Sequence, residues 1–276
     1  MHRKAVVAGH FYEGKKERLI EEIKECFLKG PGKLPEVKKN GGKIKGLVVP
    51  HAGYMYSGYV AAFAYYEIAQ DFPDKFIILG PNHHGYGASV AIMSEGTWET
   101  PLGEIEIAED ARKYCRGIIK DDEIAHRYEH SIEVQLPFLQ FLSSDFTFIP
   151  ICFGWQDWDT VKEAADILKE AEDAVFIASS DFSHVNFSGF PTPDDIDEFV
   201  KKKDMLAIEK ILQLDAKGLV EIVEEKNITM CGYGAVATML EALKGRAREA
   251  KLLKYATSYD IEPGTYCVGY AAIAII

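Results

Sequence analysis

Short apolar runs rich in β-branched residues recur along the chain, each bounded by Gly, Pro or Asp. Such runs predict buried strands, here at residues 44–49, 75–79, 146–151 and 174–178. Between them, apolar residues recur at helical spacing, which predicts helices at residues 15–28, 59–70, 131–142, 160–170, 194–212 and 234–243. Strands that alternate with helices predict an α/β fold with a mostly parallel sheet and helices on both faces.

Two further stretches modify this pattern. Residues 98–107 contain a Thr-Pro-Leu-Gly turn followed by alternating Glu and Ile, which predicts a half-exposed strand and adds an antiparallel element to a mixed sheet. The apolar run 266–276 is too short for a membrane span, which needs about 20 residues, and suits a buried strand. Since no linker or repeat divides the chain, we expect one domain over residues 1–276.

The net charge and the cysteine content indicate which partners and which cellular compartment to expect. The net charge of −12 repels phosphate backbones and anionic lipids, so we expect neither nucleic acid nor a membrane as partner. The five cysteines are odd in number and scattered, which argues against a disulfide framework. The apolar stretch near the N-terminus is too short for a signal peptide. These features predict a cytoplasmic protein.

Three of the predicted strands are followed by a loop that contains histidine. His51 follows the first strand, His83 the second, and His184 the strand at residues 174–178. In an open α/β sheet, ligands bind at the carboxyl ends of the strands, because the loops converge there. Imidazole is a common neutral metal ligand, so His51 and His83 are candidates for one metal ion. For each alone, a hydrogen-bonded structural role is the alternative.

A third ligand could come from Cys231, which precedes an Ala-rich helix. A helix N-terminus favours the thiolate, the form that binds metal. From composition and spacing alone, burial as a small apolar residue is the better interpretation. The remaining cysteines fall in strand or amphipathic patterns and are assigned to packing: Cys26, Cys115, Cys152 and Cys267.

Two polar clusters could supply acid and base groups. His130 and Glu133 lie in a dense polar segment before an apolar helix, where a helix-capping role is the alternative. Asp181 and His184 lie three residues apart in one loop, so the carboxylate could orient a general acid or base. Serines flank this pair, but the G-x-S-x-G and S-x-x-K motifs of serine hydrolases do not occur.

Five segments together resemble, in order, the motifs of the Memo family, whose archaeal and bacterial members are also called AmmeMemoRadiSam system protein B. They are PHAGY at 50–54, LGPNHH at 79–84, EHSIE at 129–133, SSDFSH at 179–184 and MCG at 230–232. The resemblance covers nearly the whole chain. It implies a fold similar to the class III extradiol dioxygenases, in which two histidines and a glutamate hold iron.

In Memo proteins a cysteine stands at the glutamate position. The resemblance therefore implies that His51, His83 and Cys231 hold one metal ion, iron or copper rather than zinc, and that His184 is the acid or base. The leading hypothesis is a metal-dependent oxidoreductase in which Asp181 orients His184. His130 and Glu133 are further candidate catalytic residues, expected to line the pocket.

Two other functions remain open at this point. One is a binding module that grips a peptide or small molecule in a dioxygenase-like cleft without chemistry. The other is zinc-dependent hydrolysis by a metal-activated water, although no H-E-x-x-H motif occurs. The sequence does not specify the substrate or the oligomeric state.

Overall fold

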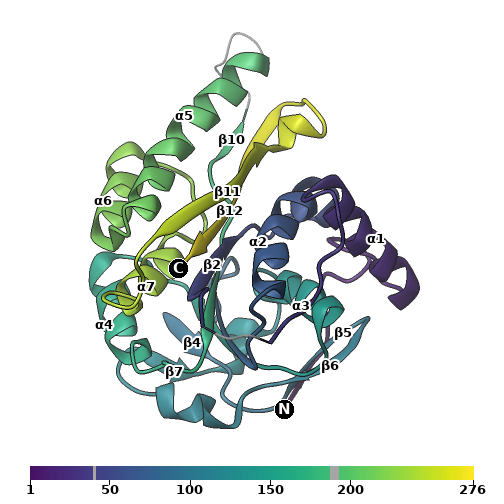
Figure 1. Cartoon of the computed structure of the whole chain (residues 1–276). Coiled ribbons are helices and arrows are strands. Elements are labelled where there is room, and N and C mark those ends of the chain that lie inside the picture. Colours follow the sequence, from purple (N-terminus) through teal and green to yellow (C-terminus); the bar gives the residue numbers. More distant parts are fainter. Residues whose placement is uncertain (40–41, 187–192) are drawn as a thin grey trace.

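A nine-stranded mixed sheet forms the centre of the molecule in the computed structural model, which describes residues 1–39, 42–186 and 193–276 (Figure 1). Its strands run in the order β10-β12-β2-β9-β3-β8-β4-β7, and β11 also pairs with β12. Their bounds are β2 (Gly46–Val49), β3 (Lys75–Pro81), β4 (Val90–Ile92), β7 (Ile119–Asp121), β8 (Thr147–Phe153), β9 (Val175–Ser179), β10 (His184–Asn186), β11 (Ala250–Thr257) and β12 (Tyr266–Ile275).

Parallel pairing is concentrated in the middle of this sheet. Strands β2, β9, β3 and β8 are parallel, and they are the continuous apolar runs that the sequence predicts to be buried on both faces. Antiparallel pairing extends the sheet through β12, beside β2, and through β4, beside β8. The predicted α/β fold is thus confirmed, whereas β4, β7, β10 and β11 were not predicted because they are short or half-exposed.

A small second sheet holds the N-terminus. Strands β5 (Thr97–Thr100) and β6 (Gly103–Glu106) form the antiparallel element expected from the turn at Pro101, and β1 (His2–Arg3) adds parallel to β5. Trp98, which belongs to β5, is fully buried. This sheet brings Arg3, far away in sequence, next to the segment around residues 126–133.

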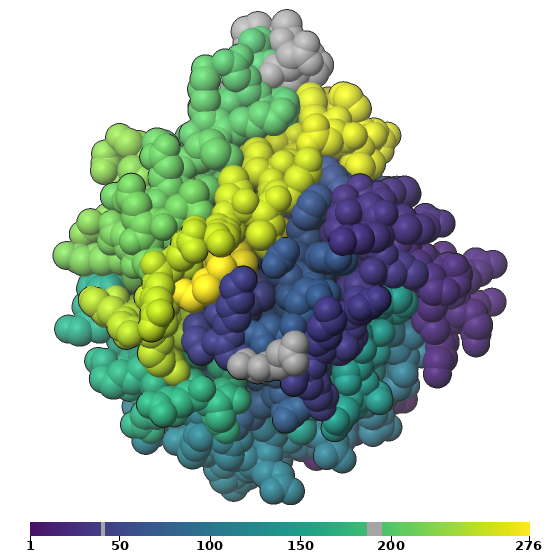
Figure 2. All heavy atoms as spheres, in the orientation of Figure 1, coloured from purple at the N-terminus to yellow at the C-terminus, as the bar shows by residue number. Residues whose placement is uncertain are grey.

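Helices cover both faces of the large sheet (Figure 1). On one side lie α1 (Lys16–Lys29), α2 (Tyr59–Ala69) and α3 (Leu136–Leu142); on the other lie α4 (Trp158–Leu168), α5 (Pro193–Leu212), α6 (Ala216–Lys226) and α7 (Tyr233–Ala242). In Figure 2 the yellow band of β11 and β12 separates the green helices from the purple and blue N-terminal helices. None of the helices in the described ranges is long and apolar enough to cross a membrane.

The carboxyl ends of β2, β9 and β3 lie side by side at one edge of the sheet. Val49 pairs with Ser179, and Leu79 pairs with Ala178, so the three chains leave the sheet at nearly the same level. After β2 the chain passes through a π-helical turn, Tyr54–Gly58, before α2 begins. The loops that follow these three strands therefore converge, as the sequence predicts.

Candidate metal centre

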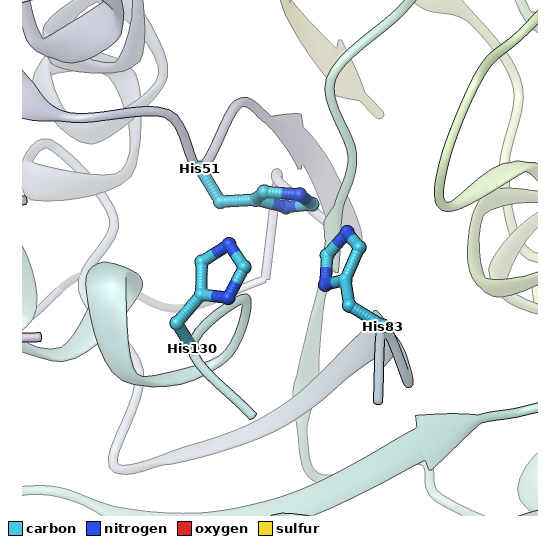
Figure 3. Close-up of side chains that lie close together, drawn as sticks. All are labelled: His51, His83 and His130. Carbon is cyan, nitrogen blue, oxygen red and sulfur yellow. The ribbon is translucent and has the colours of Figure 1, made fainter. Parts of the chain in front are cut away.

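Three imidazole rings meet above the ends of these strands (Figure 3). The ring centroid of His51 lies 5.2 Å from that of His83 and 5.5 Å from that of His130, and the last two lie 4.7 Å apart. One nitrogen of each ring lies within 4.8 Å of the others. This spacing suits three ligands of a single metal ion.

Hydrogen bonds determine which nitrogen of His51 carries the proton. The hydroxyl of Ser179 donates its only hydrogen to the Ser131 carbonyl at 2.7 Å and accepts a hydrogen bond from the Gln135 amide at 2.8 Å. Nδ1 of His51, 2.8 Å from the same hydroxyl oxygen, must therefore be the donor. This leaves the lone pair of His51 on Nε2, which is the state a metal ligand requires.

His83 is held in the same way by a buried carboxylate. Glu129 accepts a hydrogen bond from Nδ1 of His83 at 2.9 Å, and also from the backbone N–H groups of His83, His130 and Ser131. Burial alone would raise the pKa of Glu129, but these bonds, that from the His83 ring first, hold it well below its usual range. The charged carboxylate keeps the proton of His83 on Nδ1, so Nε2 is again free to bind a metal.

Cys231 lies beside this group, just before α7 as predicted. Its Sγ atom is 3.2 Å from Nε2 of His51 and accepts a hydrogen bond from the backbone N–H of Asp181 at 3.3 Å. It contacts His51 but is not part of the group of three mutually close ligand atoms. Burial, followed by the charge of Asp181, raises the pKa of the thiol, contrary to the thiolate expected from its place before the helix. A bound cation would offset this effect and favour the thiolate.

Asp181 lies in the loop after β9 and His184 begins β10, but each has its own partner. The carboxylate of Asp181 accepts a hydrogen bond from the backbone N–H of His51 at 2.8 Å. His184 is held by Thr229, whose carbonyl accepts from Nδ1 at 3.0 Å and whose hydroxyl bonds to both the N–H and the carbonyl of His184. The orienting role assigned to Asp181 stays a prediction, while Thr229 is a contact that sequence reasoning missed. Its only signal was its place two residues before Cys231.

His130 and Glu133 point in different directions in the structure. The ring of His130 stacks on His83 and lies 4.7 Å from the ring of Phe11, and burial lowers its pKa to about 4. His130 could therefore act as a third nitrogen ligand as well as an acid or base. Glu133 faces away, toward the N-terminal segment, where it pairs with Arg3 at 2.8 Å and accepts from the hydroxyl of Tyr12 at 2.7 Å. Its catalytic role remains untested.

The centre thus combines three imidazoles with one thiol at the loop end of an α/β sheet, a donor set suited to a transition metal. A model of the family described as Memo-like protein matches residues 3–274. The chain is 45% identical to a MEMO1 family protein of Methanopyrus kandleri and 44% identical to one of Sulfurisphaera tokodaii, in each case over 99% of this chain and at least 98% of the relative. A relative from Thermotoga neapolitana is 41% identical over 98% of both chains. The chain belongs to the Memo family.

Proposed function

We propose that this protein is a cytoplasmic oxidoreductase that depends on one iron or copper ion and acts on a small molecule. The observation that carries the proposal is the pair of imidazoles, His51 and His83, whose Nε2 lone pairs are both left free by hydrogen bonds at Nδ1. The sulfur of Cys231 lies next to the first of them. All five cysteines are free, which supports a reducing compartment.

The residues that would hold the metal are His51, His83 and Cys231. Nitrogen and thiolate sulfur together favour iron, copper or zinc over magnesium or calcium. Once bound, the ion would supply a Lewis acid and a redox centre. The hydrogen-bonded carboxylate of Glu129 and the hydroxyl of Ser179 keep both rings aimed at this point, a support that typically contributes about 10–100-fold in metal affinity.

His184 is the group proposed to move a proton. Since its Nδ1 donates to the Thr229 carbonyl, Nε2 carries the lone pair and can accept a proton from a bound substrate. Asp181 lies three residues before His184; burial raises the pKa of its carboxyl, and the nearby His184 opposes this rise. His130 is a second candidate for this role, because its ring flanks that of His83.

Metal analysis of anaerobically purified protein tests the ligand set. Replacing Cys231 by Ser is expected to lower the bound metal sharply, and Cys115→Ser, a half-buried cysteine elsewhere, is the matched control. His184→Ala should keep the metal and lose turnover. If Cys231→Ser keeps its full metal content and His130→Ala loses metal, the third ligand is the imidazole of His130 and not the thiolate of Cys231.

Experiments on the purified wild-type protein also distinguish the oxidoreductase from the two other candidate functions. If the cleft is a binding module without chemistry, a ligand will bind equally well after dialysis against a chelator. If the function is zinc-dependent hydrolysis, the anaerobically purified protein will contain a redox-silent metal. Either result would contradict the oxidoreductase.

A further inference from the structure

A pocket lies beside the connection between β11 and β12, the yellow segment that projects beside α5 in Figure 1. Its volume is about 380 Å³. The residues that line it are Tyr56, Ser258, Glu262, Pro263, Gly264, Thr265, Tyr266, Val268 and Tyr270. Aromatic rings and a single carboxylate therefore dominate the lining, and none of the described residues that line it is cationic.

Three tyrosine rings form part of the lining. Tyr266 is 50% exposed, whereas Tyr270 is 2% exposed and presents little of its surface to the pocket. In the part of the chain that the structure describes, Tyr56, Tyr266 and Tyr270 make no ring contact with one another. The faces of aromatic rings carry partial negative charge and attract organic cations.

The carboxylate of Glu262 adds a full negative charge to this pocket. It accepts a hydrogen bond of 3.4 Å from the hydroxyl of Tyr56. Among the described residues no Lys, Arg or His forms an ion pair with it. An uncompensated carboxylate beside three aromatic rings is the combination that recognises an alkylated ammonium group.

Local hydrogen bonds shape this connection in advance of any ligand. Thr257 and Asp260 form a reciprocal cap at its start, and the hydroxyl of Ser258 accepts from the backbone N–H of Val268 at 3.1 Å. The hydroxyl of Tyr259 donates to the Gly264 carbonyl. A pocket formed in this way loses little conformational entropy when a ligand binds.

The pocket borders His184. The ring of Tyr266 lies 6.4 Å from that of His184, the proposed proton acceptor. A ligand that contacts Tyr266 would thus lie close to His184. We propose that this pocket binds the organic ammonium group of a cationic substrate, so that the protein acts on an amine or methylated amine. The assignment to a substrate rests on the proposed function; the binding of a cation does not.

Calorimetric titration of the full chain with choline, and with its neutral isostere 3,3-dimethylbutan-1-ol, tests the charge requirement. We expect choline to bind at least about fivefold more tightly. Tyr266→Ala should weaken choline binding by a similar factor, and Tyr266→Phe, which keeps the ring, should retain it. Glu262→Gln should also weaken binding, whereas Glu106→Gln, an exposed carboxylate on β6, should not. Equal binding of the two probes, or an unchanged affinity in Tyr266→Ala, would overturn the proposal.

Repeating the titration with metal-free and metal-loaded protein keeps the two proposals separate. Choline binding that persists without metal supports the pocket even if the metal centre is assigned wrongly. The link to the centre is tested by nuclear magnetic resonance of the histidine rings: choline should shift the signals of His184 and leave those of exposed His10 unchanged. Binding without any shift at His184 would refute a substrate role.

Discussion

The substitution Glu129→Gln tests the role of the carboxylate that holds His83, because it removes one charge and changes the side-chain volume very little. All four partners of this carboxylate are donors: three backbone N–H groups and the ring of His83. Three of the four bonds go to one oxygen, Oε1, and the fourth, from the backbone N–H of His83 at 2.6 Å, goes to Oε2. A glutamine offers only one acceptor oxygen.

In its best orientation, the glutamine side chain of this variant would keep three bonds and turn its own NH₂ group against the His83 backbone N–H. A buried donor left without an acceptor costs about 1–3 kcal/mol, so the free energy of unfolding should fall by this amount. The imidazole of His83 also loses its charged partner. Metal affinity should therefore fall about 10–100-fold, or about 1.4–2.7 kcal/mol.

Competition with a chromogenic chelator measures the affinity, and denaturant unfolding of the metal-free protein measures the stability. Glu133→Gln is the matched control for metal affinity, since Glu133 is equally buried but bonds to Arg3, Tyr12 and the backbone near the N-terminus. A folded Glu129→Gln protein that binds metal as tightly as wild type would refute the idea that this carboxylate orients His83.

Three more predictions concern stability. Glu133→Gln leaves Arg3 buried without its ion-pair partner, so the free energy of unfolding should fall by about 3–5 kcal/mol with metal affinity nearly unchanged; equal stability in urea unfolding would contradict this. Burial raises the pKa of Asp204 from 3.8 to about 6, so its contribution to stability is complete below pH 3.8 and is lost as the pH rises through 6. Asp204→Asn should therefore gain stability relative to wild type between pH 4 and pH 7, and a constant difference would disprove the assignment. Metal at 100 times its dissociation constant should add about 2.7 kcal/mol, and removing it with a chelator should lower the melting temperature by about 5 °C or more.

Local pattern was enough to predict the centre of the fold. Strands β2, β3, β8 and β9 are continuous apolar runs because both of their faces are covered by helices, so the sequence signal was strong. Because loops converge at the carboxyl ends of such strands, the sequence also predicted that His51 and His83 lie close together. By contrast, β11 is half-exposed, and its two lysines, Lys251 and Lys254, interrupt the apolar residues without regular alternation, so it has little periodic signal.

Several contacts of the centre were decided only by the tertiary structure, because they join residues that are distant in the chain. Glu133 occurs in the same motif as His130, and sequence placed both at the pocket, yet the fold turns Glu133 toward Arg3, 130 residues away. Thr229 holds His184 across 45 residues, although its only sequence signal was its place two residues before Cys231. Sequence periodicity reports which face of an element is buried, but not which polar group of another element packs against it. Hydrogen bonds between distant segments, and with them the tautomers of the histidines, follow only from how the elements pack.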